Sequence, residues 1–148
     1  MASRRSGGLQ SLIKIAENAV NEAMGYMGSI QKKIEAEKEK EKTLIQYEAD
    51  YQAVFLAKGQ QGVHGTAIEQ HEAFMGQIEQ ALDHQSNHVH QLKEQLEQAR
   101  EVYNNLNQKL KIYQKLEQRM SDQALRLEAK KVQNQLDEIA IQMHLRRE

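Results

Sequence analysis

The segment Lys58-Gly-Gln-Gln-Gly-Val-His-Gly-Thr66 places three glycines within seven residues, whereas the sequence on either side runs for many turns without a helix breaker. Gly59 suits the left-handed backbone position just past the end of a helix. Thr66 and Glu69 have the spacing of a capping box, in which a hydroxyl and a carboxylate bond the free amides at a helix start. The segment therefore predicts a helix, a loop over residues 59–65 and a second helix, and so short a loop favours antiparallel neighbours.

The composition supports long helices rather than a compact globular fold. The chain has 148 residues and contains no proline, cysteine or tryptophan. At the usual proline content of about 5%, roughly seven prolines would be expected, and proline is the residue that most damages a helix interior. Aromatic residues, at 5%, are too few for a compact core, whereas 39% hydrophobic residues are too many for a disordered chain.

Several classes of protein are excluded by the same composition. The absence of cysteine excludes a disulfide scaffold, a thiol nucleophile and thiolate metal sites. A formal net charge of −1 removes the electrostatic argument for nucleic acid as the main partner. Residues 9–20 are interrupted by polar side chains, and no stretch approaches about 18 uninterrupted apolar residues. We therefore expect neither a signal peptide nor a transmembrane helix, and a cytoplasmic location.

Apolar residues at three-four spacing predict helices over about residues 9–58 and 66–146, after a disordered stretch at residues 1–8. In the second helix one heptad frame holds across residues 68–127. Its interruptions are His71, Gln85 and Glu117. Two long helices and no predicted strand make the expected fold class all-α. Each apolar stripe is too narrow to be buried alone, so we expect the two helices to pair along their stripes. We predict a long antiparallel two-helix coiled coil, an α-helical hairpin, that forms a single domain over residues 1–148.

The first helix loses its apolar stripe at Glu37 and Glu41, within the charged run of residues 32–42. We interpret this run as a solvated stretch held by Glu-to-Lys pairs such as Glu39 with Lys42. Because charged residues stand there where apolar ones are expected, the run also predicts a soft point in the seam between the helices.

The unequal lengths of the two helices are the most informative result. About 50 helical residues span roughly 75 Å, and about 80 span roughly 120 Å. Folding around Gly62 brings residue 9 beside about residue 115, so residues 116–148 have no partner in their own chain. These residues still carry an apolar stripe of Leu125, Val132, Leu136, Ile139 and Met143. An unpaired amphipathic helix predicts a binding partner, either a second copy or another protein.

No motif for catalysis stands out. His84 and His88 have the i, i+4 spacing that a metal can bridge, and His90 is close by, but all three fall off the apolar seam. We interpret them as exposed polar residues and predict no metal site. The glycine-rich segment lacks the lysine and the strand of a phosphate-binding loop. The carboxylates lie on helix surfaces with nothing to enclose them, so we predict no enzyme activity, no cofactor and no small-molecule substrate.

An aromatic strip lies near the predicted loop. Tyr47 and Val54 from the first helix and Phe74 from the second fall beside the seam rather than on it. These side chains either widen the core near the hairpin tip or leave an exposed recognition surface, since tyrosine and phenylalanine give contact area at low entropic cost.

The chain resembles the FliJ family of flagellar type III export proteins over nearly its whole length. The first matching region is Leu44-x-x-Tyr47-x-x-x-Tyr51, the glycine loop, and then Phe74-Met75-x-x-Ile78-x-x-Ala81-Leu82-x-x-Gln85. The second is Tyr113-x-x-Leu116-Glu117-x-Arg119, then Arg126-x-Glu128-x-Lys130-Lys131 and Asp137-Glu138-x-Ala140, closing with Leu145-Arg-Arg147. The combination of hairpin length, loop position and C-terminal charge pattern carries the resemblance.

The resemblance implies a stalk similar to that of rotary ATPases. Such a stalk docks in the centre of the hexameric export ATPase ring and favours ring assembly, engages the transmembrane export gate protein and handles export chaperones. Carried over by position, the export-gate surface comprises Leu44, Tyr47, Tyr51, Phe74, Ile78, Ala81 and Gln85, with Lys40 at its polar edge. The ATPase-ring surface comprises Arg119, Arg126, Lys130, Lys131, Asp137 and Glu138.

The function implied is that of a non-enzymatic stalk and coupling component of the bacterial flagellar type III protein export apparatus, required for motility and chemotaxis. Its expected place is the cytoplasm, peripheral to the inner membrane at the flagellar basal body. The stalk protein of a virulence-type type III secretion system and a homodimeric structural coiled-coil adaptor are the alternatives. Basic residues alternate with glutamate and form no long basic face, which disfavours a nucleic-acid partner. A stalk predicts a mostly monomeric, elongated particle.

Overall fold

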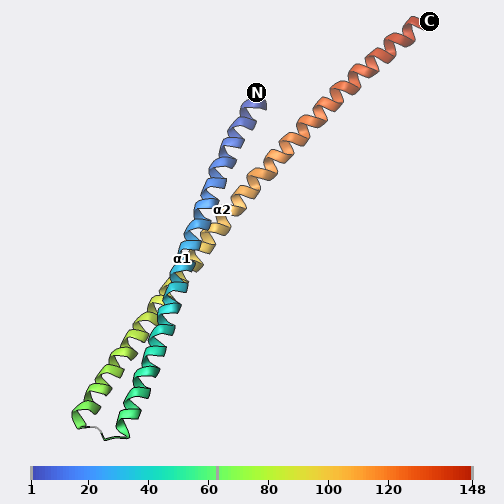
Figure 1. Cartoon of the computed structure of the whole chain (residues 1–148). Helices are drawn as coiled ribbons and strands as arrows, with labels where there is room; N and C mark the ends of the chain where they lie inside the picture. Colours follow the sequence, from blue (N-terminus) through green and yellow to red (C-terminus); the bar gives the residue numbers. More distant parts are fainter. Residues whose placement is uncertain (1, 63, 148) are drawn as a thin grey trace. The chain divides into compact units, whose positions relative to one another are not determined.

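The computed structural model describes residues 2–62 and 64–147. They form two helices, α1 (Ala2–Gly59) and α2 (Gly65–Arg147), and no strand is present within these ranges (Figure 1). The prediction of an all-α helical hairpin is confirmed. Met1, Val63 and Glu148, which the predicted boundaries include, lie outside the described residues.

The first helix begins earlier than the sequence predicted. α1 starts at Ala2, whereas disorder was expected through residue 8. Gly7 and Gly8 each cost about 1 kcal/mol in a helix, but no proline interrupts the backbone there. The next turns are held by packing, because Leu9 and Ile13 are buried. Helical stability in proteins comes mainly from such packing rather than from propensity.

The turn between the helices is made by a different glycine from the one expected. The Gln61 amide donates to the Lys58 carbonyl oxygen over 3.0 Å. The Gly62 amide donates to the Gly59 carbonyl oxygen over 3.2 Å. Because these bonds reach three residues back, the last turn of α1 tightens and continues past Gly59. The left-handed conformation falls on Gly62, with φ 91°, rather than on Gly59 as predicted.

The start of α2 also differs from the predicted capping box. The His64 carbonyl oxygen accepts hydrogen bonds from the amides of Ala67 and Ile68, over 3.0 and 3.3 Å. This pattern makes His64 the residue that caps the helix. Thr66 therefore lies inside the first turn, since α2 begins at Gly65. The capping box of Thr66 and Glu69 is wrong by two positions, because the tightened end of α1 leaves fewer residues to the turn.

The chain divides into two compact units, which we describe separately. The hairpin unit comprises Glu22–Tyr103 and contains the turn. Its core is a cluster of buried side chains from both helices, with Met27 and Leu96 packed against it. The cluster members are Ile30, Ile34, Leu92 and Ala99. Ile30 is the most enclosed of them, with 1% of its surface exposed.

The terminal unit comprises Met1–Asn21 and Asn104–Glu148. Its buried side chains are Leu9, Ile13, Val20 and Leu110. Every side chain of residues 121–147 is exposed, so this stretch of α2, which we call the overhang, has no helix of its own chain beside it (Figure 1). The overhang starts close to residue 116, where the length arithmetic placed it. The heptad seam therefore ends at Met120, and Ala124 and Leu127 are exposed rather than paired.

Within the residues that the structure describes, neither helix has an apolar stretch long enough to cross a membrane.

Candidate functional site

An aromatic cluster lies near the turn of the hairpin unit. The Tyr51 and Phe74 rings have centroids 4.3 Å apart, and the Tyr47 and Phe74 rings 5.9 Å apart, in tilted arrangements. Tyr51 and Phe74 are half-buried, while 55% of Tyr47 is exposed. Of the predicted strip, Phe74 therefore widens the core, whereas Tyr47 and Val54 stand on the surface, each more than half exposed. That this exposed part is a recognition surface stays a prediction.

His71 belongs to the same cluster, which the sequence did not indicate. Its ring stacks nearly parallel on Phe55, with centroids 3.7 Å apart, and on Tyr51, with centroids 5.3 Å apart. Its Nδ1 atom is buried without a hydrogen-bond partner among the described residues. The heptad frame treated His71 as an interruption. The imidazole instead packs at the seam against the aromatic rings of α1. Its seam position in the heptad frame, together with the aromatic residues on α1, could have predicted this packing.

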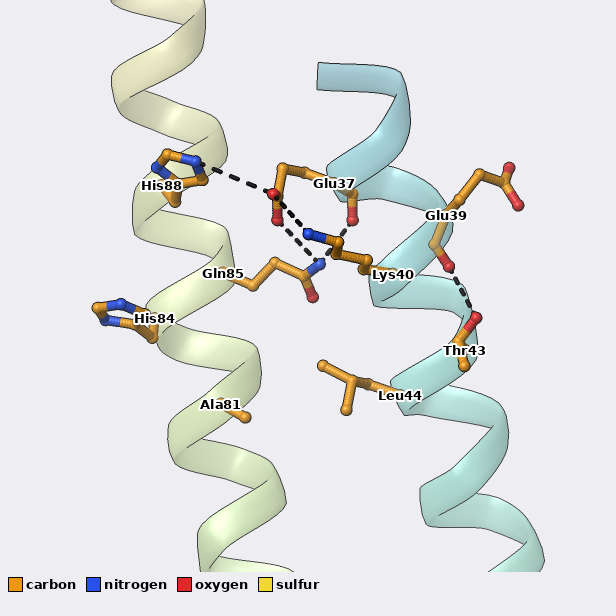
Figure 2. A pocket seen from close by; sticks show the side chains of 9 residues that line it. All are labelled: Glu37, Glu39, Lys40, Thr43, Leu44, Ala81, His84, Gln85 and His88. Atoms are coloured by element: carbon orange, nitrogen blue, oxygen red, sulfur yellow. Dashed lines mark hydrogen bonds and ion pairs between the residues drawn. The ribbon is translucent and has the colours of Figure 1, made fainter. Parts of the chain in front are cut away.

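About three helical turns further from the loop, a polar layer crosses the seam. The Gln85 Nε2 atom donates to the Glu37 backbone carbonyl oxygen over 2.6 Å and to Glu37 Oε2 over 3.3 Å. Glu37 Oε1 lies 3.4 Å from Lys40 Nζ and 3.9 Å from His88 Nε2. Figure 2 shows the Gln85 side chain reaching from α2 to α1, with these partners around the Glu37 carboxylate.

The polar layer affects the charge state of Glu37. The hydrogen bond from Gln85 holds the pKa of the Glu37 carboxyl below its ordinary value. Partial burial acts in the opposite direction, and the neighbouring charges of Lys40 and His88 lower the pKa further. Glu37 is therefore an ionised seam residue at neutral pH, although only 17% of its side chain is exposed.

Beside the polar layer, the hairpin unit has a groove of about 720 Å³ between its two helices. Figure 2 shows its walls, which come from α1 and α2. The lining residues are Glu37, Glu39, Lys40, Thr43, Leu44, Ala81, His84, Gln85 and His88. Leu44 and Ala81 provide its apolar side, and the charged groups stand around them.

The structure brings the predicted gate residues together from both helices, but at different depths. Tyr47 and Ala81 are exposed, whereas Leu44, Tyr51 and Phe74 are half-buried. Ile78 and Gln85 are buried, with 5% and 7% of their surface exposed. Three of these residues line the groove, and three form the aromatic cluster. The residues that line the groove are Leu44, Ala81 and Gln85.

The predicted ATPase-ring residues lie on the last part of α2. Arg119 lies two residues before the overhang, and the others lie within it. All six are exposed, and they are Arg119, Arg126, Lys130, Lys131, Asp137 and Glu138. The overhang also carries the predicted apolar stripe, including Leu125 and Leu136, which are 67% and 55% exposed. A second apolar row, which the sequence analysis did not single out, consists of Leu127, Ile141 and Leu145.

The histidines near the groove are exposed, as expected. His90 Nε2 lies 3.1 Å from Glu94 Oε1, and His88 faces Glu37. Among the described residues, no group of three or more histidine, aspartate or glutamate side chains is placed to hold a metal ion.

Comparison of the sequence with known proteins identifies the family of the chain. A family model described as "Flagellar FliJ protein" matches residues 5–148. The chain is 24% identical to the flagellar FliJ protein of Escherichia coli (strain K12) over 141 residues, which cover 95% of this chain and 96% of that protein. It is 23% identical to the flagellar FliJ protein of Salmonella typhi, with the same coverage. No solved structure matches. The chain therefore belongs to the flagellar FliJ protein family.

Proposed function

We propose that this protein is a non-enzymatic stalk and coupling component of the flagellar type III export apparatus. Membership of the FliJ family supports a role in flagellar export. The overhang supports the proposal of a stalk that binds another protein, because all its described side chains are exposed although many are large and apolar. Exposed apolar surface of this extent marks a binding site for another molecule.

The proposed partner of the overhang is the hexameric ring of the export ATPase. A helix that is apolar on one side lies on a surface, whereas a helix that is apolar on several sides is enclosed. The overhang has two apolar rows, which suits an enclosing site such as the centre of a ring. The charged residues carried over from the family, from Arg119 to Glu138, would pair with groups on the ring. Tighter binding to the assembled ring would shift the ATPase toward its hexameric state.

The proposed partner of the hairpin unit is the transmembrane export gate. Tyr47, Ala81 and the exposed parts of Leu44 and Phe74 form its contact surface. Ile78 and Gln85 support this surface from the seam, since both are buried. The protein would then act in the cytoplasm, peripheral to the inner membrane at the basal body, where it also handles export chaperones.

The ring contact is tested with the purified protein and its cognate ATPase. We expect the protein to raise the hexamer fraction in analytical ultracentrifugation and the rate of ATP hydrolysis. The double variant Leu136→Glu with Ile139→Glu should lose both effects, because it places charges on the apolar stripe. Leu56→Glu is the matched control, since Leu56 is 62% exposed in the hairpin unit. An ATPase unaffected by the unmodified protein would contradict the ring contact.

The gate contact is tested by motility. Tyr47→Ala combined with Phe74→Ala removes two rings of the aromatic cluster, and we expect a clearly smaller swimming halo in soft agar at normal protein levels. Tyr26→Ala is the matched control, because Tyr26 is 57% exposed and lies outside the cluster. Unchanged motility of the double variant would show that these rings do not serve the gate.

A homodimeric adaptor is the competing proposal, since the stripe from Leu125 to Met143 keeps a heptad spacing that could pair with a second copy. Light scattering after size exclusion distinguishes the two. A monomer at micromolar concentration supports the stalk. A dimer supports the adaptor if the double variant Leu136→Glu with Ile139→Glu is monomeric.

A further inference from the structure

We propose that Glu37 and Gln85 hold open a socket between α1 and α2, and that this socket takes a large apolar side chain of the export gate. The socket is the groove beside Leu44 and Ala81. The inference rests on the proposed gate contact and adds to it the chemistry of the partner and a role for Glu37, which the family resemblance does not assign.

The socket exists because the seam lacks an apolar side chain at this level. The buried layers on either side hold Ile34 and Ile78. Between them the seam positions are Glu37 and Glu41 on α1, and Leu82 and Gln85 on α2. Leu82 is half-buried but does not line the groove, and Glu41 is exposed, so no apolar seam side chain faces Gln85. Ala81 is too small to fill the gap. A coiled coil normally fills each such hole with a side chain of the facing helix, so a vacant hole of this kind can receive one from a partner.

The polar layer keeps the hole from closing. Gln85 donates to the Glu37 carbonyl oxygen over 2.6 Å, which holds the two backbones at the distance of a glutamine side chain. The Glu37 carboxylate is held in turn by Gln85, Lys40 and His88. The Glu37 carboxyl, whose pKa is held below the ordinary value of 4.5 mainly by the hydrogen bond from Gln85, is ionised at neutral pH, so a carboxylate makes these contacts.

The layer is not optimal for stability. Gln85 Oε1 is buried and accepts no hydrogen bond from the described residues. An unpaired buried acceptor costs about 1–3 kcal/mol. Replacing a partly satisfied polar layer by apolar residues is often neutral or stabilising. A cost of this kind at one layer of an otherwise apolar seam is typical of a functional position.

The charges around the socket favour an uncharged occupant. Glu37 is paired with Lys40 and His88, and Glu39 Oε1 lies 3.3 Å from Lys42 Nζ. The carboxylates that line the socket are thus already paired, while Leu44 and Ala81 offer apolar surface. An apolar cavity of about 150 Å³ is enough to bind benzene, so a groove of about 720 Å³ can hold a leucine, methionine or phenylalanine side chain.

The first experiment closes the socket. In Glu37→Leu with Gln85→Leu, the polar layer becomes apolar. We expect a higher midpoint of thermal unfolding by circular dichroism, and an affinity for the purified cytoplasmic part of the gate that is lower by about tenfold, equivalent to about 1.4 kcal/mol. Glu117→Leu is the matched control, because Glu117 is another half-buried glutamate on the predicted seam but belongs to the terminal unit rather than to the hairpin unit that contains the socket. It should leave gate affinity unchanged.

The second experiment fills the socket without altering the polar layer. The chain has no cysteine, so Ala81→Cys carries its only thiol. Labelling with benzyl methanethiosulfonate places a ring in the groove, and labelling with methyl methanethiosulfonate places only a small group. We expect the benzyl adduct to lose gate affinity by about tenfold and the methyl adduct to lose little. Ala53→Cys, at an exposed position of α1 outside the groove, is the control for both labels.

The outcomes separate the two proposals. If the unmodified protein binds the gate, and the apolar double variant and the benzyl adduct bind it equally well, the socket is overturned and the gate contact stands. If the unmodified protein does not bind the gate, the gate contact itself is wrong and the socket falls with it.

Discussion

Gly62 and Glu37 show how single residues determine the hairpin. Gly62 is the residue of the described chain that has a left-handed backbone, and this conformation turns the chain from α1 toward α2. Glu37 is an ionised group at a seam position, held by Gln85. The backbone conformation of Gly62 and the hydrogen bonds of Glu37 cannot be read from the order of apolar and polar residues in the sequence. The sequence favoured Gly59 rather than Gly62 for the left-handed position, and Glu37 was predicted only as a soft point in the seam.

Substitution of Gly62 tests the turn. Gly62→Ala should lower the free energy of unfolding by about 1–2 kcal/mol, because a side chain disfavours the left-handed region. Gly25→Ala should instead raise it by about 0.5–1 kcal/mol. Gly25 lies inside α1, and an added Cβ would meet nothing within 4 Å. Urea denaturation followed by circular dichroism measures both, and equal effects of the two substitutions would contradict the assigned turn.

The pH dependence of stability tests the Glu37 layer. The pKa of Glu37 is lowered in the folded chain, so between the folded and unfolded pKa values the unfolded chain binds more protons. The stabilisation from Glu37 is therefore complete above the unfolded value and is lost as the pH falls below about 4.5. We expect Glu37→Gln to show a shallower loss of thermal stability between neutral and acidic pH than the unmodified protein. Glu39→Gln is the control, since Glu39 is exposed. An unchanged acid profile in Glu37→Gln would exclude this role.

At the scale of helices, the apolar seam predicted most of the packing. On α2, the seam positions of the heptad frame are buried or half-buried from His71 to Met120, whereas Ile68, at the start of the predicted frame, is 44% exposed. The cluster around Ile30 joins α1 to α2. The frame was wrong at Leu127, which has no helix beside it, and incomplete at His71, which packs as an aromatic residue. Periodicity shows which face of a helix is apolar, but burial also requires a neighbour on that face.

The core cluster should dominate the stability of the hairpin unit. Ile30→Ala removes a side chain that is 1% exposed and leaves a cavity, so we expect the free energy of unfolding to fall by about 2–5 kcal/mol. Ile45→Ala should change it by no more than about 0.5 kcal/mol, because Ile45 is 51% exposed. Chemical denaturation gives both values. A small effect at Ile30 would mean that the cluster is not the core.

At the scale of the whole molecule, the overhang separates a part that stabilises the fold from a part that is free to bind. Buried side chains of the terminal unit lie in residues 9–20 and at Leu110, and none of residues 121–147 is even half-buried. The unequal lengths of the two predicted helices already indicated this division. The arithmetic succeeded because the rise per residue of a helix is constant.

Truncation tests that division. Ending the chain after Ser121 removes a segment whose described residues, 122–147, are all exposed. A loss of about 1 kcal/mol would lower the midpoint of thermal unfolding by about 2–8 °C. We expect a smaller change, with the midpoint within about 2 °C of that of the unmodified protein. The same truncation should abolish the effect on the export ATPase. A large loss of thermal stability would show that the overhang contributes to the fold, and an undiminished effect on the ATPase would place the ring contact elsewhere.

The number of helices, their order, the position of the turn and the unpaired end of α2 all follow from the sequence, because helix propensity, apolar periodicity and rise per residue are local properties of a chain. The bond from Gln85 to Glu37, the stacking of His71, the turn at Gly62 and the groove beside Ala81 depend instead on how far one helix is shifted along the other and on which side chains meet across the seam. A shift of one residue would change each of these contacts while leaving every helix in place. Such details are set by packing between distant segments, and only the folded chain contains them.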